Sequence, residues 1–258
     1  MEEGASYFVR LGDSRFEPTV HTGGAWDVRE QHISPMVGLI AHLIEQHTAG
    51  SGKELRRLSV DILGVLTLEP FSVEVHTIRS GRTIELVEAV VIEAGRPAVR
   101  ARGWLLSPHD SSAVAGGVGT PMTPPDQVPP RPFADWPGGF IASLEGRPVR
   151  PTRPGSAEIW LSTALPIVGG EQVSDLAAFC GLVDTSNGVS VRESPDEWLF
   201  PNLDLTIHLH RAPRGRWVGL QTDVVLGAEG SGLTSAVLHD EAGPVGRAAQ
   251  VLTVRLRH

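Results

Sequence analysis

Two polar side chains in the last quarter of the chain could together activate a water molecule. Asp204 lies on the polar side of an alternating run that begins Pro201-Asn202-Leu203, and Gln250 lies in the last apolar run. A carboxylate at the start of one strand can take a proton from water, and an amide on a neighbouring strand can orient that water. On spacing alone, a surface aspartate and an edge glutamine are the commoner interpretation, so the pair needs independent support.

Three other side chains with reactive chemistry fit structural roles better. His208 and His210 share a face of the alternating run, but no third ligand follows at a fixed spacing, so a solvated or interface pair is favoured over a metal site. Cys180 lies on the apolar stripe of an expected helix and is interpreted as a core residue rather than a nucleophile. A single cysteine forms no internal disulfide, which fits a reducing compartment.

The familiar catalytic motifs are missing from the sequence. No G-x-S-x-G, G-x-x-x-x-G-K-[ST], G-x-G-x-x-G or H-E-x-x-H pattern occurs. The first marks classical serine hydrolases, the second and third mark phosphate and dinucleotide sites, and the fourth marks zinc proteases. All of these classes are therefore disfavoured.

Composition and charge narrow the class of partner. The chain has 258 residues and a net charge of −8, from 22 Lys+Arg and 30 Asp+Glu, without a basic cluster. It lacks the positive charge that supplies most nucleic-acid affinity, and an anionic membrane surface would repel it. No stretch approaches the roughly 18 apolar residues that span a bilayer. We therefore expect a cytoplasmic protein that binds neither nucleic acid nor membrane.

Two helix patterns, each followed by strand patterns, position the polar residues. In the first half Ser34-Pro35 predicts an N-cap and an N1 proline, and apolar residues then recur at helical spacing until Gly50. In the second half the same spacing runs over 173–183. Alternating or apolar runs predict strands over 58–62, 71–78, 83–93 and 98–106, and over 203–209, 217–226, 233–239 and 245–256.

The two halves are related as an internal repeat. Leu58-Ser59-Val60 corresponds to Leu203-Asp204-Leu205 at an offset of 145 residues, and Glu93-Ala94-Gly95 corresponds to Glu241-Ala242-Gly243 at an offset of 148. A helix followed by a long antiparallel sheet, occurring twice, predicts an α+β fold of two copies. Two unrelated α+β domains are the alternative.

A segment rich in proline and glycine separates the two halves. Of the 20 prolines, 11 fall between Pro108 and Pro154, a density that predicts a linker without regular structure. We therefore expect an N-terminal unit at 1–107, a linker at 108–154 and a C-terminal unit at 155–258.

The repeat motifs resemble those of the acyl-CoA thioesterase II-like family of double-hotdog proteins. The likeness rests on WLFPNLDLTIHLHR at 198–211 and DEAGPVGRAAQ at 240–250, and in the first half on GGAW at 23–26, RLSV at 57–60, RSGR at 79–82 and WLL at 104–106. The resemblance implies two hotdog units whose sheets join side by side, each with a buried helix. It also implies an acyl-CoA or related acyl-thioester substrate. No metal or organic cofactor is expected, because a thioester is already activated.

The family's catalytic residues carry over only in part. In its characterised members an Asp, a Thr or Ser, and a Gln orient the hydrolytic water. The motif match gives the first role to Asp204 and the third to Gln250, and it places Val225 where the hydroxyl residue is expected. Thr222 lies an odd number of residues away, on the opposite face of a regular strand. A valine can neither donate nor accept a hydrogen bond, so the sequence predicts weakened hydrolysis.

The resemblance also implies an oxyanion site at the start of the first helix. Backbone N–H groups there would stabilise the charge that develops on the thioester carbonyl. In this chain the stretch is His32-Ile33-Ser34-Pro35-Met36, and because Pro35 has no N–H, the donors would come from Met36, Val37 or Gly38. His32 would either line the same pocket or serve only at the helix entry.

We therefore predict an acyl-thioester hydrolase that self-associates through broad outer sheet faces carrying His208 and His210. One alternative is an acyl-thioester-binding protein that has lost catalysis, with Val225 as the mark of that loss. A second is an enoyl-thioester hydratase, but its D-x-N-P-x-H pattern does not occur.

Overall fold

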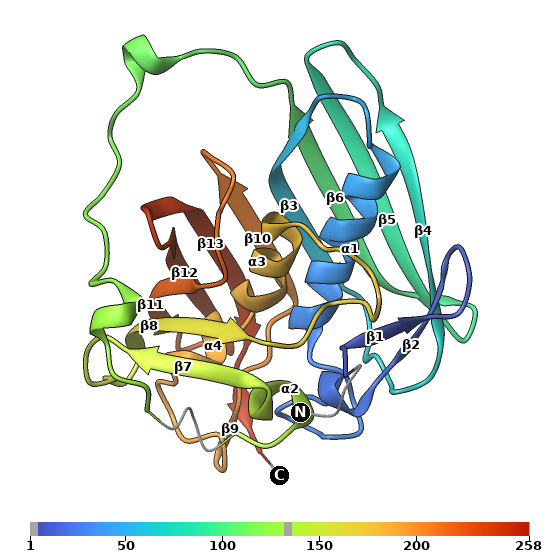
Figure 1. Cartoon of the computed structure of the whole chain (residues 1–258). Coiled ribbons are helices and arrows are strands. Elements are labelled where there is room, and N and C mark those ends of the chain that lie inside the picture. The colour runs from blue at the N-terminus through green and yellow to red at the C-terminus, as the bar shows by residue number, and fades with distance from the viewer. Residues whose placement is uncertain (1–4, 132–135, 258) are drawn as a thin grey trace.

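A twelve-stranded sheet runs through the whole computed structural model, which describes residues 5–131 and 136–257 (Figure 1). Its strand order is β1-β2-β4-β5-β6-β3-β10-β13-β12-β11-β8-β7, and all strand pairs are antiparallel. Elements of the first half are β1 (Phe8–Arg10), β2 (Arg15–Pro18), α1 (Ile33–His47), β3 (Glu54–Ile62), β4 (Phe71–Arg79), β5 (Ile84–Glu93) and β6 (Arg96–Leu106). Those of the second half are α2 (Gly139–Ala142), β7 (Leu144–Pro148), β8 (Ser156–Thr163), α3 (Asp175–Val183), α4 (Ser186–Val189), β10 (Asp204–Leu209), β11 (Val218–Leu226), β12 (Ser231–Asp240) and β13 (Gly243–Thr253). A separate pair joins β9 (Trp198–Leu199) to β14 (Arg255–Leu256).

The strand order confirms the predicted repeat. Read outward from the central β3–β10 pair, each half places its strands in the same sequence, so β4, β5 and β6 correspond to β11, β12 and β13. Gly95 lies in the turn between β5 and β6, and Gly243 is the first residue of β13, directly after the equivalent turn between β12 and β13, with φ of +76° and +120°. Glycine is favoured at such angles because it has no Cβ to clash. The fold is therefore an α+β double hotdog.

The two long helices lie side by side on one face of the sheet (Figure 1). They meet where an added Cβ on Gly38 of α1 would lie 3.0 Å from both the Ala177 carbonyl oxygen and the Gly181 Cα of α3. The start of α1 differs from the prediction: its N-cap is His32, whose side chain accepts a hydrogen bond from the Ser34 N–H, so Ser34 and Pro35 lie inside the first turn. The imidazole satisfies a helix-end donor in the way that a Ser or Asp side chain usually does.

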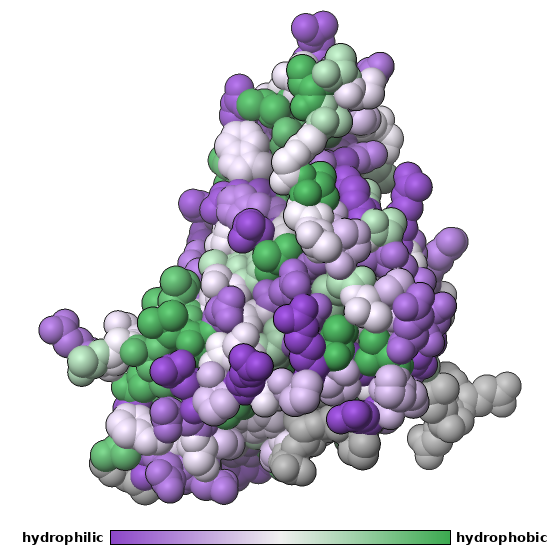
Figure 2. Space-filling model, turned by 90° about the vertical axis from the view of Figure 1, so that its left-hand side faces the viewer, coloured by the Kyte–Doolittle hydropathy of each residue, from purple (hydrophilic) through white to green (hydrophobic). Residues whose placement is uncertain are grey.

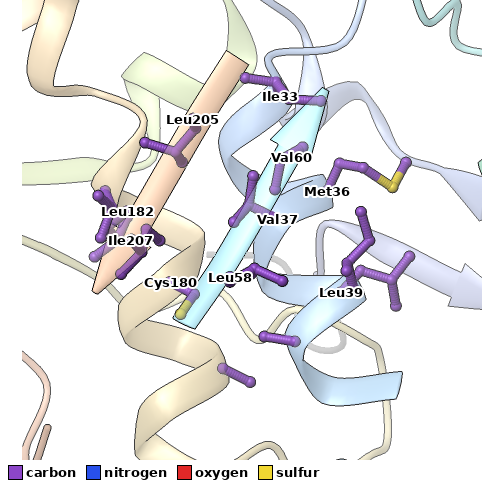
Figure 3. Close-up of a cluster of buried hydrophobic side chains, with 14 of the residues drawn as sticks. Ile33, Met36, Val37, Leu39, Leu58, Val60, Cys180, Leu182, Leu205 and Ile207 are labelled. Atoms are coloured by element: carbon purple, nitrogen blue, oxygen red, sulfur yellow. The ribbon is translucent and has the colours of Figure 1, made fainter. Parts of the chain in front are cut away.

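The main core lies between these helices and the β3–β10 seam. Figure 3 shows Leu58 and Val60 of β3 beside Leu205 and Ile207 of β10, beneath side chains of α1 and α3. Cys180 lies among them with no exposed surface, and burial raises the pKa of its thiol to about 12, so the core interpretation is confirmed. Each fully buried aliphatic side chain contributes about 1.5–3 kcal/mol to folding.

The expectation of no regular structure over 108–154 was wrong. This segment contains α2 and β7, and β7 pairs with β8 as an edge strand of the sheet. Gly138 and Gly139 of this segment pack closely against the backbone of residues 20–24. Only glycine fits there, because an added Cβ would lie 2.4 Å from the Gly24 carbonyl oxygen and 2.0 Å from that of Val20, respectively. The density of prolines did not reveal this short strand, which pairs with the next strand along the chain. The limits of the three predicted units stay predictions, and residues 1–4, 132–135 and 258 within them lie outside the described residues.

Among residues 5–131 and 136–257, the long helices α1 and α3 lie on one face of the sheet, and no α-helix covers the outer face (Figure 1). On the side of the molecule that carries the connecting segment, Figure 2 shows apolar side chains in patches separated by polar ones. Val225, Leu233 and Val251 are cross-strand neighbours on β11, β12 and β13 and are 43–64% exposed. No helix in residues 5–131 and 136–257 is both long and apolar enough to cross a membrane.

Candidate active site

A buried carboxylate lies where the start of α1 meets the end of α3. Asp184 is the C-cap of α3, and His32 is the N-cap of α1. Because the helices run antiparallel, these two caps come together, with 3.9 Å between His32 Nδ1 and Asp184 Oδ2. Asp184 is only 4% exposed.

One oxygen of this carboxylate is held by two amides. Asn202 Nδ2 and Gln250 Nε2 each donate to Asp184 Oδ1 at 2.7 Å, and Gln250 Nε2 also lies 3.3 Å from the Asp184 carbonyl oxygen. Asn202 precedes β10, and Gln250 lies on the helix-facing side of β13. The two amides fix the plane of the carboxyl group and leave Oδ2 as the oxygen nearer His32.

The environment of Asp184 brings its pKa close to neutrality. Burial raises the pKa to about 7, the hydrogen bonds from Asn202 and Gln250 lower it, and the nearby charge of Asp204 raises it. A carboxyl group with a pKa near the working pH is suited to taking up and returning a proton.

His32 is a neutral neighbour of this carboxyl group. Burial lowers the pKa of His32 to about 4. Its Nδ1 accepts the Ser34 N–H at 3.1 Å, so the ring proton is on Nε2. The ring is stacked at a tilt on Phe140, with 4.4 Å between centroids. The contact with Asp184 is therefore not an ion pair at neutral pH.

Two cavities meet at Asp184. The inner cavity, of about 40 Å³, is bounded by Trp26, Trp136, Ile141 and Asn187. The outer groove, of about 390 Å³, is bounded by Asp27, Glu30, Leu203, Arg255 and the loop 62–66. Both share the walls formed by Ala25, Trp26, His32, Asp184 and Asn202. A ligand that fills both would pass directly over the carboxyl group.

The predicted oxyanion donors are placed differently from expectation. Met36 is the fourth residue of α1 and fully buried, so its N–H falls within the intrahelical hydrogen-bond ladder, and Gly38 is committed to the contact with α3. The Ser34 N–H is taken by His32, and Ser34 itself is buried. Ile33, the first residue of α1, borders the outer groove, and none of the described residues accepts its N–H. That group is the available donor of the first turn.

The structure does not bring Asp204 and Gln250 together. Asp204 pairs across the strands with Asp61, and its Oδ1 accepts the Val251 N–H at 2.7 Å. Along β10 it shares the outer side of the sheet with His208, whereas Gln250 is 1% exposed and faces the helices. The two side chains therefore face opposite sides of the sheet, and a shared water stays a prediction that this geometry does not favour.

The position assigned to the missing hydroxyl also lies on the outer side. Val225 is 64% exposed, whereas Thr222 on the same strand is buried on the helix-facing side. Thr234 lies directly opposite Gln250 on the neighbouring strand, and it too is buried. Neither threonine hydroxyl has a hydrogen-bond partner in the part of the chain that the structure describes. Val225 therefore borders neither of the two cavities, and weakened hydrolysis stays a prediction.

Asp184 and Asn202 are the site residues that sequence reasoning missed. Asp184 follows the helix in the run Val183-Asp184-Thr185-Ser186, which is typical of an ordinary helix end. Its one distinguishing signal is that a carboxylate ends an otherwise apolar helix, where the helix dipole disfavours negative charge.

Domain comparisons agree with this architecture. The N-terminal domain of acyl-CoA thioesterases matches residues 22–106, and the C-terminal domain of acyl-CoA thioesterases matches residues 125–254. The second match begins inside the segment expected to be a linker and includes α2 and β7. No curated protein sequence gives a significant match.

Solved structures share the fold at low sequence identity. A hot dog fold protein of unknown function from Alicyclobacillus acidocaldarius superposes with a TM-score of 0.76 at 13% identity, covering 99% of this chain and 98% of the other. An acyl-CoA thioesterase II from Mycobacterium marinum gives 0.69 at 15% identity, covering 97% and 96%. A tesB protein from Mycobacterium avium subsp. paratuberculosis gives 0.68 at 16% identity, covering 96% of each chain.

Proposed function

Because this chain belongs to the acyl-CoA thioesterase family, we propose that it hydrolyses acyl-CoA or a closely related acyl-thioester to a free acid and a thiol. The observation that carries the proposal is Asp184, a buried carboxyl group with a pKa of about 7 at the junction of two cavities. The thioester carbonyl would lie at that junction, with the acyl chain on one side and the thiol portion on the other.

Asp184 acts in this scheme as the general base. Its free Oδ2 takes a proton from a water whose oxygen attacks the carbonyl carbon, and a tetrahedral oxyanion forms. When the oxyanion collapses, the C–S bond breaks and the thiolate leaves, taking the proton from Asp184. The acid product and the thiol are released, and the carboxylate is regenerated.

Gln250 and Asn202 are positioning residues. Both donate to Asp184 Oδ1, so they direct Oδ2 toward the cavity junction and limit how far burial raises the pKa of the carboxyl group. The Ile33 N–H, at the positive end of the α1 dipole, supports charge on the carbonyl oxygen. This assignment gives the proton-transfer role to Asp184 in place of Asp204.

Thiol release from a series of acyl-CoAs tests the proposal. We expect Asp184→Asn to lower kcat by about 10²–10⁴-fold, the usual loss when a general base is removed. Asp204→Asn should leave most of the activity, since Asp204 lines neither cavity. Full activity in Asp184→Asn together with loss in Asp204→Asn would restore the sequence-based assignment. If the native protein binds acyl-CoA but releases no thiol, the non-catalytic binding function is the correct one.

A further inference from the structure

We propose that the inner cavity receives the acyl chain and that Trp136, contributed by the segment between the two repeats, restricts it to short chains of about two to four carbons. This inference rests on the proposed function, because it takes the carbonyl to lie beside Asp184. It adds a specificity-determining residue and a substrate class.

The size of the two cavities decides which one takes the acyl chain. The inner cavity has a volume of about 40 Å³, with the rings of Trp26 and Trp136 and the aliphatic Ile141 in its wall. The outer groove mixes charged with aliphatic side chains, among them Arg255 and Leu63, and its volume of about 390 Å³ suits the larger thiol portion of a coenzyme.

The size of the inner cavity sets the chain length. Its volume is about 40 Å³, whereas about 10–15 Å³ is the least that admits a single water molecule. The inner cavity is therefore only a few times larger than this minimum and admits a chain of only a few carbons. A longer alkyl chain fits only if the wall moves.

Several contacts hold that wall in place. Trp136 is packed edge-on against Trp26, with centroids 4.9 Å apart, and Trp26 is packed on Phe200 at 5.0 Å. Trp136 Nε1 donates to the Gly188 carbonyl oxygen at 3.1 Å, which joins the segment to α4. Directly after Trp136, the backbone at Gly138 and Gly139 is fixed against residues 20–24 too closely for any side chain. Outward movement of the Trp136 ring would break these contacts.

Trp136→Ala removes the ring that closes the cavity, and Trp104→Ala is the matched control. Trp104 lies on β6, lines neither cavity and stacks with Arg79. Two quantities are measured across chains from acetyl to decanoyl: kcat/KM for the acyl-CoAs, and Kd for the corresponding S-alkyl-CoA thioethers, which cannot be hydrolysed. Ile141→Phe is a second variant that fills the same cavity without removing the tryptophan.

For the native protein and Trp104→Ala, we expect affinity to rise about fourfold per methylene up to about four carbons, and then to stop rising or fall. In Trp136→Ala the rise should continue for roughly two or more further methylenes. Ile141→Phe should lower kcat/KM for butyryl-CoA at least tenfold relative to kcat/KM for acetyl-CoA. Equal preference for long chains in the native protein, or an unchanged profile in Trp136→Ala and Ile141→Phe, would overturn the inference. Chain-length-limited thioether binding without hydrolysis would instead overturn the proposed function while supporting the cavity assignment.

Discussion

Replacing Asp184 by asparagine should make the protein more stable at alkaline pH while removing its activity. The amide has the shape of the carboxyl group, and its oxygen can still accept the hydrogen bonds from Asn202 and Gln250. The change removes only the ionisation. The difference in unfolding free energy between variant and native protein therefore reports the cost of charging a buried carboxyl group.

The magnitude follows from the raised pKa of Asp184, about 7 in the folded chain against 3.8 as its ordinary value. A folded pKa above the unfolded one means that the folded state holds the proton more tightly. The group's contribution to stability is therefore complete below about pH 4 and is lost as pH rises to about 7. Between pH 5.5 and 8.5 the native protein should lose about 2 kcal/mol from this group, and above pH 8 the total loss approaches about 4 kcal/mol. The Asp184→Asn variant has no carboxyl group to ionise at this position, so its free energy of unfolding should show neither loss.

Urea unfolding at pH 5.5, 7 and 8.5 measures this difference directly. The stability of Asp184→Asn minus that of the native protein should increase by about 2 kcal/mol over that range. Asp223→Asn, an exposed carboxylate on the outer side of β11, should show no such trend. A pH-independent difference for Asp184→Asn would refute the reasoning, because it would mean that burial does not raise this pKa.

Three further predictions concern neighbouring features. Gln250→Leu removes a donor that lowers the pKa of Asp184, so the rise of kcat/KM with pH should move to higher pH. An unchanged pH profile would show that Gln250 does not influence the pKa of this carboxyl group. Gly38→Ala should lower the free energy of unfolding by about 1–3 kcal/mol in urea, because its Cβ would lie 2.7 Å from Ile167 Cδ1, whereas Gly64→Ala meets nothing within 4 Å and should have little effect. We also expect self-association through the outer sheet face; Leu233→Lys should then lower the mass measured by light scattering at micromolar concentration, and a native protein that is already monomeric would contradict the expectation.

Strand positions were the most predictable part of the fold, and side-chain placement at the site the least. The alternation of Leu205, Ile207 and Leu209 marks a half-buried strand whatever surrounds it, and β10 is found there. Strands β1 and β7 are short and lack such alternation, and β2 alternates over only four residues, so their pairing partners rather than their own sequences stabilise them.

Errors at the site have two physical causes. The motif match placed Val225 at the hydroxyl position, but Val225 lies on the outer side of β11 and Thr222 on the helix-facing side, because residues an odd number apart on a strand lie on opposite faces. Asp184 was missed because its significance depends on Gln250, which is 66 residues away, and on the start of the other helix. No local pattern encodes a contact of that kind.

The β3–β10 seam also bears on how the chain folds as it is synthesised. When only the first half has left the ribosome, β3 is paired with β6 on one side and has no partner on the other. Its second partner is β10, where Ile207 pairs with Leu58, and β10 has not yet been synthesised. An unpaired edge of this length can pair with another chain, and the long sequence separation makes correct closure slow. A fragment that ends after β6 should therefore pair with itself along β3, forming a homodimer in place of the seam that the complete chain closes internally.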